Sequence, residues 1–237
     1  MASLIDRLLK VAKKNEYASI LSESTIVDNE MLFTTDIPML NVALSGQLDG
    51  GMKAGILQIV GDSRTFKTCY ALILMSAYLK TYPDAVAIFF DSERGASFEY
   101  FDTFGIDKKR VLHFPITSVE DFSGQAKQQL TEIKRGERVF FFVDSLGLLP
   151  STKEVEDAQN DHAAADMTRA KQMNSLWRVI TIEIGLKNLP FVAINHFYDT
   201  MAKYPEKIIK GGKGGFLASN DIWLVTRSKV KDGKDSK

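Results

Sequence analysis

The sequence predicts an α/β fold, in which a mostly parallel, doubly wound sheet is flanked by helices and preceded by a small helical arm. Short apolar runs alternate with segments of helical periodicity, as in chains that build parallel sheets. One run passes through a turn of small and polar residues into a helix, which is typical of a phosphate-binding loop. Polar residues follow three later runs, at the strand ends where open α/β sheets bind ligands.

Length and composition favour an ordinary globular protein. The chain has 237 residues, enough for one large α/β domain with a small extension, and is 45% hydrophobic and 25% charged. Its formal net charge is zero, so any affinity for nucleic acid must come from local patches. The single cysteine, Cys69, excludes an internal disulfide and fits a reducing compartment. With no signal-peptide pattern and no apolar run of roughly 18 residues, we expect a cytoplasmic protein without a membrane partner.

The first residues predict an amphipathic helix. Apolar residues recur at helical spacing over 3–14, Ser3 can cap the helix, and lysines gather at its end. Such a helix can fold back on its own domain or dock on another subunit, and the sequence leaves these alternatives level. Residues 15–35 predict a linker with a short strand, so we expect an arm and linker over 1–34 and a core over 35–237.

Residues 56–68 predict a strand, a phosphate-binding loop and the start of a helix. Gly61, Lys67 and Thr68 match the pattern G-x-x-x-x-G-K-[ST], although Phe66 stands where the second glycine belongs. In such loops backbone N–H groups and the helix dipole hold phosphate, the lysine reaches the β- and γ-phosphates, and the hydroxyl binds Mg²⁺. We expect Lys67 to be an exposed side chain at the end of the loop. The residues expected to bind nucleotide here are Gly61, Asp62, Ser63, Arg64, Thr65, Phe66, Lys67 and Thr68. An ordinary strand–turn–helix with a chance glycine and lysine is the alternative.

The remaining elements are predicted from periodicity and from turn residues. In chain order they are a short helix and glycine-rich turn within 36–55, helix 67–80, a strand within 85–93, helix 97–104, strand 111–114, helix 118–135, a strand within 138–145, helix 166–184, strand 191–194 and strand 222–226.

Acids follow two of the buried strands. Asp91 and Glu93 end the first, and Asp144 ends the second, which places all three at the carboxyl edge of a parallel sheet. Asp144 there would hold Mg²⁺ through a water beside Thr68. The alternative for Asp91 and Glu93 is that they begin a loop.

Two segments fit neither strand nor helix. Residues 151–165 are acidic, and residues 197–219 predict a long loop rich in glycine and lysine. Residues 203–237 hold nine Lys/Arg (203, 207, 210, 213, 227, 229, 231, 234, 237) and four acids (206, 221, 232, 235), giving a net charge of +5. Such a segment suits contact with a nucleic-acid backbone, and a solvated surface loop is the alternative. The residues expected to bind DNA are Lys203, Lys207, Lys210, Gly211, Gly212 and Lys213.

Taken together, these motifs resemble the RecA recombinase superfamily and, more closely, the phage UvsX recombinases, from about residue 3 to the end. The segments that carry the resemblance are Ile37–Gly46, Gly61–Thr68, Phe89–Glu93, Val143–Gly147, Asp166–Lys171 and Ala193–His196. UvsX-type proteins also have phenylalanine before the loop lysine, and His196 stands where cellular RecA has a glutamine that senses the γ-phosphate.

The resemblance implies a RecA-like P-loop NTPase that uses ATP and Mg²⁺. Thr68 and Asp144 would bind the metal, Glu93, Lys67 and His196 would be catalytic, and Tyr100 would stack on adenine. Segments 151–165 and 197–219 match the two DNA-binding loops, and helix 3–14 matches an arm that docks on a neighbouring protomer. The implied activity is a DNA-dependent ATPase that forms a helical filament on single-stranded DNA and exchanges strands with double-stranded DNA. Mediator and single-strand-binding proteins are the further partners implied.

The family continues with further core strands after the last strand found here, so the resemblance also implies a core that is incomplete at its C-terminus. Cationic groups that the family supplies to a neighbour's ATP lie in that later part, and we expect a chain of this length to be a poor recombinase. The alternatives are a RecA-core helicase or regulatory ATPase, and a truncated chain that binds nucleotide without turnover.

Overall fold

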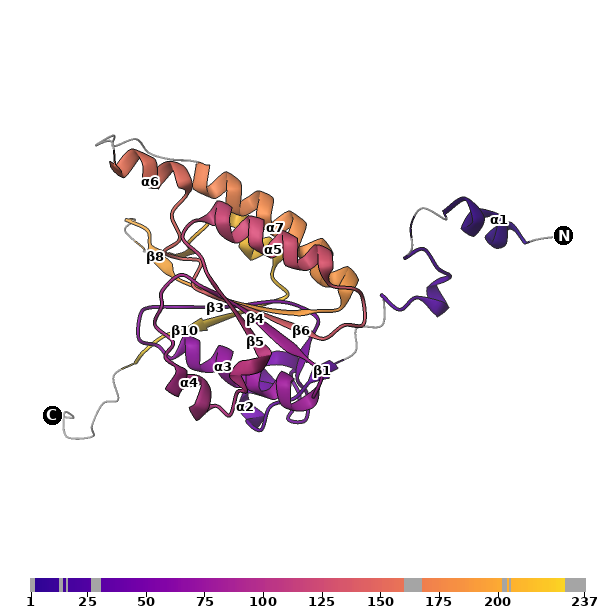
Figure 1. Ribbon diagram of the computed structural model, residues 1–237, viewed down its shortest axis with the longest axis horizontal. Coiled ribbons are helices and arrows are strands. Elements are labelled where there is room, and N and C mark those ends of the chain that lie inside the picture. The colour runs from indigo at the N-terminus through magenta and orange to yellow at the C-terminus, as the bar shows by residue number, and fades with distance from the viewer. Residues whose placement is uncertain are drawn as a thin grey trace.

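The computed structural model describes residues 3–12, 15, 17–26, 31–159, 168–201, 204 and 206–228. A central sheet lies between two layers of helices (Figure 1). One layer holds α5 (Val119–Glu132) and α7 (Thr168–Lys187), and the other holds α2 (Pro38–Ser45), α3 (Lys67–Thr81) and α4 (Phe98–Thr103). This arrangement confirms the α/β fold that the sequence predicts.

The sheet has six strands in the order β10-β3-β7-β6-β4-β5, and every neighbouring pair is parallel. The strands are β3 (Gly55–Gly61), β4 (Val86–Asp91), β5 (Val111–Pro115), β6 (Val139–Asp144), β7 (Pro190–Asn195) and β10 (Asp221–Val225). A short 3₁₀ turn, η3 (Lys108–Arg110), leads into β5. Because all the strands run the same way, the residues after β3, β4, β6 and β7 meet at one edge.

Strand β6 shows why the apolar runs are continuous. All of its residues are buried, and the five apolar residues before Asp144 alternate between two cores. Phe141 and Val143 pack with α5 and α7, whereas Phe140 and Phe142 pack with α3. A strand covered by helices on both faces needs apolar side chains at every position, which is the pattern in the sequence.

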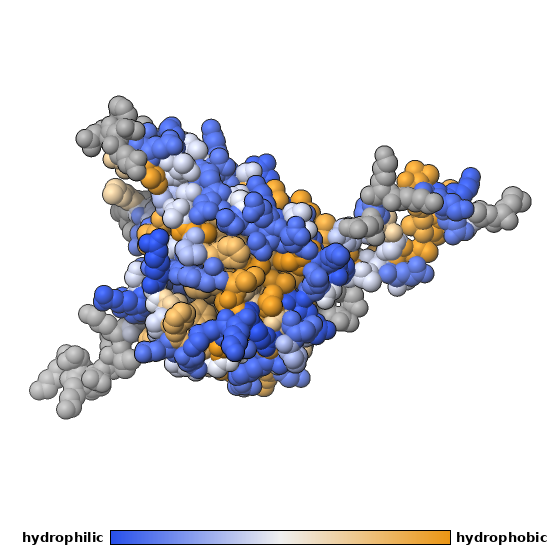
Figure 2. All heavy atoms as spheres, viewed as in Figure 1, coloured by the Kyte–Doolittle hydropathy of each residue, from blue (hydrophilic) through white to orange (hydrophobic). Residues whose placement is uncertain are grey.

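The N-terminal arm stands away from the sheet (Figure 1). Its helix, α1 (Leu4–Val11), is capped by Ser3 and Asp6 in a capping box, and none of residues 4–11 is buried. In Figure 2 its apolar side chains form a patch separate from the body, and Leu4, Leu8 and Val11 are 61%, 61% and 83% exposed. The helix therefore does not fold back on its own domain. Lys13 and Lys14, at the predicted helix end, lie outside the described residues.

The linker between the arm and the core has little regular structure of its own. It includes η2 (Leu21–Glu23) and β1 (Met31–Phe33), and β1 pairs antiparallel with β2 (Met52–Lys53). The Arg135 guanidinium donates hydrogen bonds to the carbonyls of Thr25 and Leu186, which fastens the linker to the body. The predicted short strand is confirmed.

The acidic segment after β6 was expected to be irregular, and this prediction is wrong for its first part. Residues 152–159 form helix α6 (Thr152–Gln159). The Ser151 hydroxyl accepts the Glu154 N–H, and the Glu154 carboxylate accepts the Ser151 N–H, so the two residues form a capping box. Residues 160–167, which include the start of the predicted helix 166–184, lie outside the described residues.

The expectation of a long loop over 197–219 is also wrong. Strand β8 (Phe197–Asp199) pairs antiparallel with β9 (Lys207–Ile209), and α8 (Lys213–Ala218) follows. Gly215 is required by packing, because a Cβ there would lie 2.9 Å from the side-chain nitrogens of Gln58 and Trp177. Gly214 and Gly215 therefore allow α8 to lie close to α7. Among the described helices, none combines the length and the apolar composition that a membrane crossing requires.

Candidate functional site

A cavity of about 430 Å³ lies at the carboxyl edge of the sheet, where β3, β4, β6 and β7 end. Most of the predicted nucleotide-binding residues meet in it. The residues that line it are Ser63, Arg64, Thr65, Phe66, Lys67, Thr68, Cys69, Glu93, Gly95, Tyr100, Asp144, Ile194 and His196.

The loop between β3 and α3 is a tight turn that leads directly into the helix. Gly61 passes so close to β10 that a Cβ would lie 2.4 Å from the Val225 carbonyl oxygen. Thr65 is buried and its hydroxyl donates to the Asp62 carbonyl at 2.8 Å. Phe66 has φ +64°, so it occupies the left-handed region that a glycine would favour, with its ring in solvent. The phenylalanine therefore takes the backbone conformation that the second glycine of the pattern would take, and its side chain points away from the protein interior.

Lys67 is folded into the loop, and the expectation that it is exposed is wrong. The residue is 6% exposed, and its Nζ donates to the Asp62 carbonyl oxygen at 2.7 Å. Burial lowers the pKa of Lys67, and the nearby carboxylates of Glu93, Asp144 and Asp62 oppose this shift. Within the part of the chain that the structure describes, the ammonium donates to this one carbonyl at the cavity wall. An anion in the cavity would take the place of the carbonyl oxygen as the acceptor.

Thr68 and Asp144 contact each other across the cavity floor. The Thr68 hydroxyl donates to Asp144 Oδ2 at 2.7 Å, whereas Asp144 Oδ1 is buried and has no hydrogen-bond partner among the described residues. Burial raises the pKa of Asp144 to about 6, the Thr68 hydrogen bond opposes this, and Glu93 and Asp91 add to it. A buried carboxylate oxygen without a partner next to a hydroxyl fits a hard cation such as Mg²⁺. No group of three or more His, Cys, Asp or Glu side chains in the described ranges could hold a metal alone, so water and phosphate oxygens would complete its shell.

Glu93 and His196 face each other in the same cavity. The Ser145 hydroxyl donates to Glu93 Oε1 at 2.5 Å, and His196 Nε2 lies 3.5 Å from the same oxygen. The imidazole and the Ser145 hydroxyl lower the pKa of Glu93 despite partial burial. At 3.5 Å the imidazole is too far for a good hydrogen bond, so Nε2 has no such partner among the described residues. Gly147 allows this packing, because a Cβ there would lie 2.6 Å from His196 Cδ2.

Tyr100 lies on α4 at the cavity wall, 42% exposed. Its hydroxyl is 4.0 Å from the Cys69 sulfur, and this contact raises the pKa of Tyr100. This ring gives the cavity wall a flat apolar surface next to the loop between β3 and α3.

Asn195 joins the cavity to the 197–219 segment. Its Oδ1 accepts the His196 N–H at 2.8 Å, and its Nδ2 donates to Gln58 Oε1 and to the Lys210 carbonyl, each at 3.0 Å. Gln58 in turn donates to the Ser219 hydroxyl at 2.8 Å. This buried group of side chains ties the residue before the segment, its middle and its end to the sheet.

The predicted DNA-binding lysines are spread along the segment rather than gathered. Lys207 lies 3.4 Å from Asp199 and 3.7 Å from the centre of the Phe197 ring, Lys210 is half-buried, and Lys213 is exposed at the start of α8. Gly211 and Gly212 have φ of +97° and +82°, which glycine adopts readily. Lys203 lies outside the described residues.

Sequence reasoning missed Ser145 and Gly147, which position Glu93 and His196. Both come just after Asp144, so their position beyond the end of a predicted strand could have placed them at the functional edge of the sheet. Asp91, which was expected at the functional edge, is not among the described residues that line the cavity. Its carboxylate instead accepts backbone N–H groups of the following loop.

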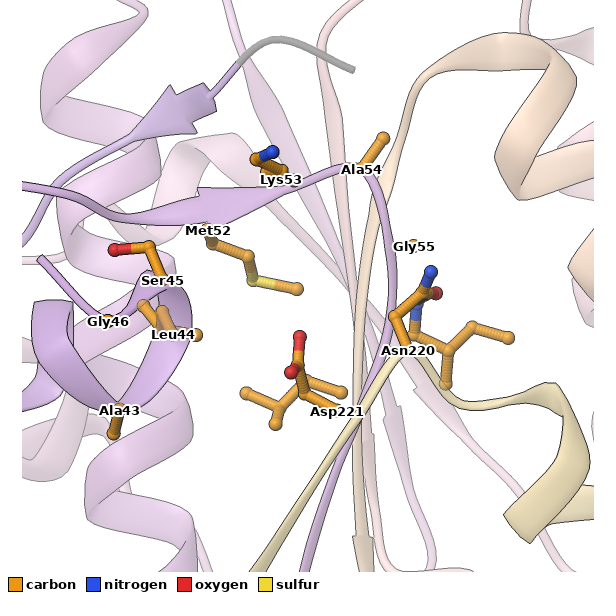
Figure 3. Close-up of a pocket in the computed structure, with 12 residues that line it drawn as sticks. Ala43, Leu44, Ser45, Gly46, Met52, Lys53, Ala54, Gly55, Asn220 and Asp221 are labelled. Atoms are coloured by element: carbon orange, nitrogen blue, oxygen red, sulfur yellow. Dashed lines mark hydrogen bonds between the residues drawn. The ribbon is translucent and has the colours of Figure 1, made fainter. Parts of the chain in front are cut away.

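A second cavity of about 460 Å³ opens at the opposite, amino edge of the sheet (Figure 3). The end of α2, the turn before β3 and the first residues of β10 surround it, and Asp221 lies within it. Burial raises the pKa of Asp221. None of the predicted site residues lines this cavity, and the carboxyl edge remains the candidate site because its polar groups converge.

The parallel sheet, with polar residues gathered at its carboxyl edge, fits the class of nucleotide-binding α/β proteins. Over 235 residues the chain is 40% identical to a protein named "Recombination and repair protein" from Enterobacteria phage T4. The match covers 99% of this chain and 60% of the phage protein, so the chain spans less than two thirds of the length of that relative. No family model matches the sequence.

Proposed function

We propose that the cavity binds ATP with Mg²⁺ and hydrolyses it, and that the chain acts in DNA recombination and repair as a recombinase. The observation that carries the ATP site is the Thr68–Asp144 contact at 2.7 Å, with the second Asp144 oxygen unpaired among the described residues and the Lys67 ammonium at the same cavity. A hydroxyl, a carboxylate and a lysine at the end of a glycine-led loop are the groups that hold Mg²⁺ and nucleotide phosphates.

Lys67 would exchange its hydrogen bond with the Asp62 carbonyl for phosphate oxygens, and the N–H groups at the start of α3 would face the same anion. Thr68 and Asp144 would hold the metal, either directly or through water. When bound, Mg²⁺ neutralises charge that develops on the phosphate oxygens during transfer.

Glu93 would orient the attacking water and accept its proton. Its lowered pKa keeps the carboxylate ionised at neutral pH, and the Ser145 hydroxyl fixes one of its oxygens. His196 would contact the γ-phosphate with Nε2, the nitrogen that lacks a hydrogen-bond partner among the described residues. Because the N–H of His196 and the carbonyl of Lys210 bond to the same Asn195 side chain, this contact would be communicated to the 197–219 segment.

The recombinase part of the proposal is supported by the similarity to the phage T4 protein. DNA would contact Lys207, Lys210 and Lys213 of the 197–219 segment. The apolar face of α1, which stands free of the body, would dock on a second copy and build a helical filament on single-stranded DNA (Figure 2). Pairing with double-stranded DNA and contacts with mediator and single-strand-binding proteins belong to the same proposal.

ATP hydrolysis by the purified chain, with and without single-stranded DNA, tests the proposal. We expect DNA to stimulate turnover. Glu93→Gln should retain ATP binding and lower kcat by roughly 10²–10⁴-fold, because the amide cannot accept the proton from water. Glu99→Gln is the matched control, since Glu99 is exposed on α4 and does not line the cavity. Unchanged turnover in Glu93→Gln would place the base elsewhere, and a wild-type chain that never hydrolyses ATP would contradict the assignment.

A further inference from the structure

Asp91 is a buried carboxylate that the proposed hydrolysis does not use. It is 4% exposed at the end of β4, and its Oδ1 accepts the N–H groups of Glu93 at 3.1 Å and of Arg94 at 2.6 Å. Its Oδ2 lies 3.1 Å from His113 Nε2, on the edge strand β5. All these contacts shape the loop that carries Glu93 or join that loop to β5.

The loop that carries Glu93 has an unfavourable backbone conformation, so other residues must stabilise it. Arg94 has φ +54°, in the left-handed region that residues with side chains avoid. Ser92 attaches the loop on the β6 side by two hydrogen bonds. Its hydroxyl donates to the Ser145 carbonyl at 2.8 Å and accepts the Ser145 N–H at 2.9 Å. Asp91 attaches the loop on the β5 side, through His113. Glu93 directly follows Asp91 and Ser92, so both attachments hold the backbone next to it.

The direction of the Glu93 side chain matters because the residue borders two cavities. One is the cavity that holds Lys67, and the other has a volume of about 500 Å³ and is lined by Arg94, Ile116 and Leu148 among others. In the structure Glu93 Oε1 contacts Ser145 and His196, so the carboxylate faces the first cavity. A looser loop would let the carboxylate turn toward the second cavity.

His113 is placed to act through Asp91 and not on a nucleotide. Its side chain is 51% exposed, its ring stacks on Phe89 at 5.4 Å, and it is not among the described residues that line the Lys67 cavity. Nε2 is the ring nitrogen that faces the Asp91 carboxylate, and Phe89 fixes the plane of the ring.

We propose that His113 and Asp91 are positioning residues that hold the Glu93 loop so that its carboxylate faces the nucleotide cavity. This inference rests on the proposed role of Glu93 in ATP hydrolysis. His113 donates a hydrogen bond to Asp91, and Asp91 accepts the two loop N–H groups with its other oxygen. A residue at an exposed sheet edge thereby controls the geometry of the base.

The test compares His113→Phe, which keeps a ring on Phe89 but removes the donor, with His113→Gln, which keeps an N–H donor. We expect His113→Phe to lower kcat about tenfold, less than loss of the base itself, and to leave KM and ATP affinity within about twofold. His113→Gln should recover most of the loss. In a Glu93→Gln background His113→Phe should lower kcat no further, because its effect passes through Glu93.

Amide hydrogen exchange on the full chain gives a readout that does not depend on turnover. We expect the Glu93 and Arg94 amides to exchange faster in His113→Phe than in wild type or His113→Gln. Equal exchange in all three proteins, or a further loss of kcat in the Glu93→Gln background, would overturn the inference. If wild type binds no ATP while the exchange pattern holds, the proposed function fails and the positioning of the loop stands.

Discussion

Polar side chains are clustered in the cavity at the carboxyl edge and spread out along the 197–219 segment. In the cavity, side chains from separate elements contact one another: Thr68 with Asp144 at 2.7 Å, and Ser145 and His196 with Glu93 at 2.5 and 3.5 Å. In the segment, the nearest charged partner of Lys207 is Asp199, eight residues away on the same hairpin. A parallel sheet brings distant residues to one point, whereas a hairpin spreads its charges along a surface. Single substitutions should therefore have large effects in the cavity and small, additive ones in the segment.

The largest effect is expected for Lys67→Ala. The change removes the ammonium that would bind phosphate and leaves the Asp62 carbonyl without this donor. Removing a charge-assisted hydrogen bond corresponds to a fall in ATP affinity of roughly 10²-fold, with only a modest change in stability. Lys207→Ala is the matched change in the segment and should leave ATP affinity unaltered. Equilibrium titration with a fluorescent ATP analogue measures both, and equal affinities for the two variants would contradict the contrast.

The next effect concerns Asp144, whose charge is buried in the absence of a cation. Because its folded-state pKa of about 6 lies above the ordinary value of 3.8, the folded protein binds this proton more tightly than the unfolded chain. The group stabilises the fold most below about pH 4, and this contribution is lost as pH rises through about 6. At pH 7 and above, Asp144→Asn should raise stability by up to roughly 3 kcal/mol, since one pKa unit corresponds to about 1.4 kcal/mol.

Thermal unfolding from pH 4 to pH 8 checks this sign. We expect wild type to lose stability relative to Asp144→Asn across the interval, and two parallel pH curves would contradict the assignment of the shift to Asp144. The same substitution should weaken Mg²⁺-dependent ATP binding, because an amide is a poorer ligand than a carboxylate for a hard cation. In wild type that binding should weaken below about pH 6, where Asp144 becomes protonated.

The difference between the regions also explains what the sequence could predict. The positions of residues at strand ends can be predicted from the sequence. An apolar run followed by an acid places Asp144 and Glu93 at one edge of a parallel sheet, whatever the details of packing. The packing role of Gly214 and Gly215 could not be predicted because its cause is distant in sequence: a Cβ on Gly214 would lie 2.2 Å from Asn174 Oδ1, forty residues away. The burial of Lys67 depends on a turn that brings the Asp62 carbonyl back to it, which no local pattern reports. The capping box of Ser151 and Glu154, by contrast, was readable in the sequence and would have predicted α6.

A smaller effect is expected when Lys210 and Lys213 are both changed to glutamine. Each lysine that no longer neutralises a DNA phosphate should reduce the slope of log affinity against log salt by about 0.7–1, while ATP affinity stays the same. Lys127→Gln with Lys134→Gln removes two exposed charges elsewhere and is the control. Binding to single-stranded DNA at several salt concentrations measures the slope. If both double variants give the wild-type slope, the segment is a solvated surface and the cavity is the only functional region of the two.

The smallest effect is expected at Phe66. Both regions contain residues with positive φ, but the residue types differ. Gly211 and Gly212 take positive φ without a side chain, whereas Phe66 holds φ +64° with a ring that is 70% exposed. The left-handed conformation costs a residue with a Cβ roughly 1–2 kcal/mol, which a glycine would avoid. The greater freedom of glycine in the unfolded chain offsets about 0.5–1 kcal/mol of this gain.

Phe66→Ala keeps the Cβ and removes the same ring, so the comparison of Phe66→Gly with Phe66→Ala isolates the effect of the backbone. We expect the glycine variant to be more stable than the alanine variant by about 1 kcal/mol in thermal unfolding, and both to retain ATP binding because the N–H groups of the loop remain. Equal stabilities would mean that the loop relaxes when the ring is removed, and that the left-handed turn at Phe66 depends on the phenylalanine itself.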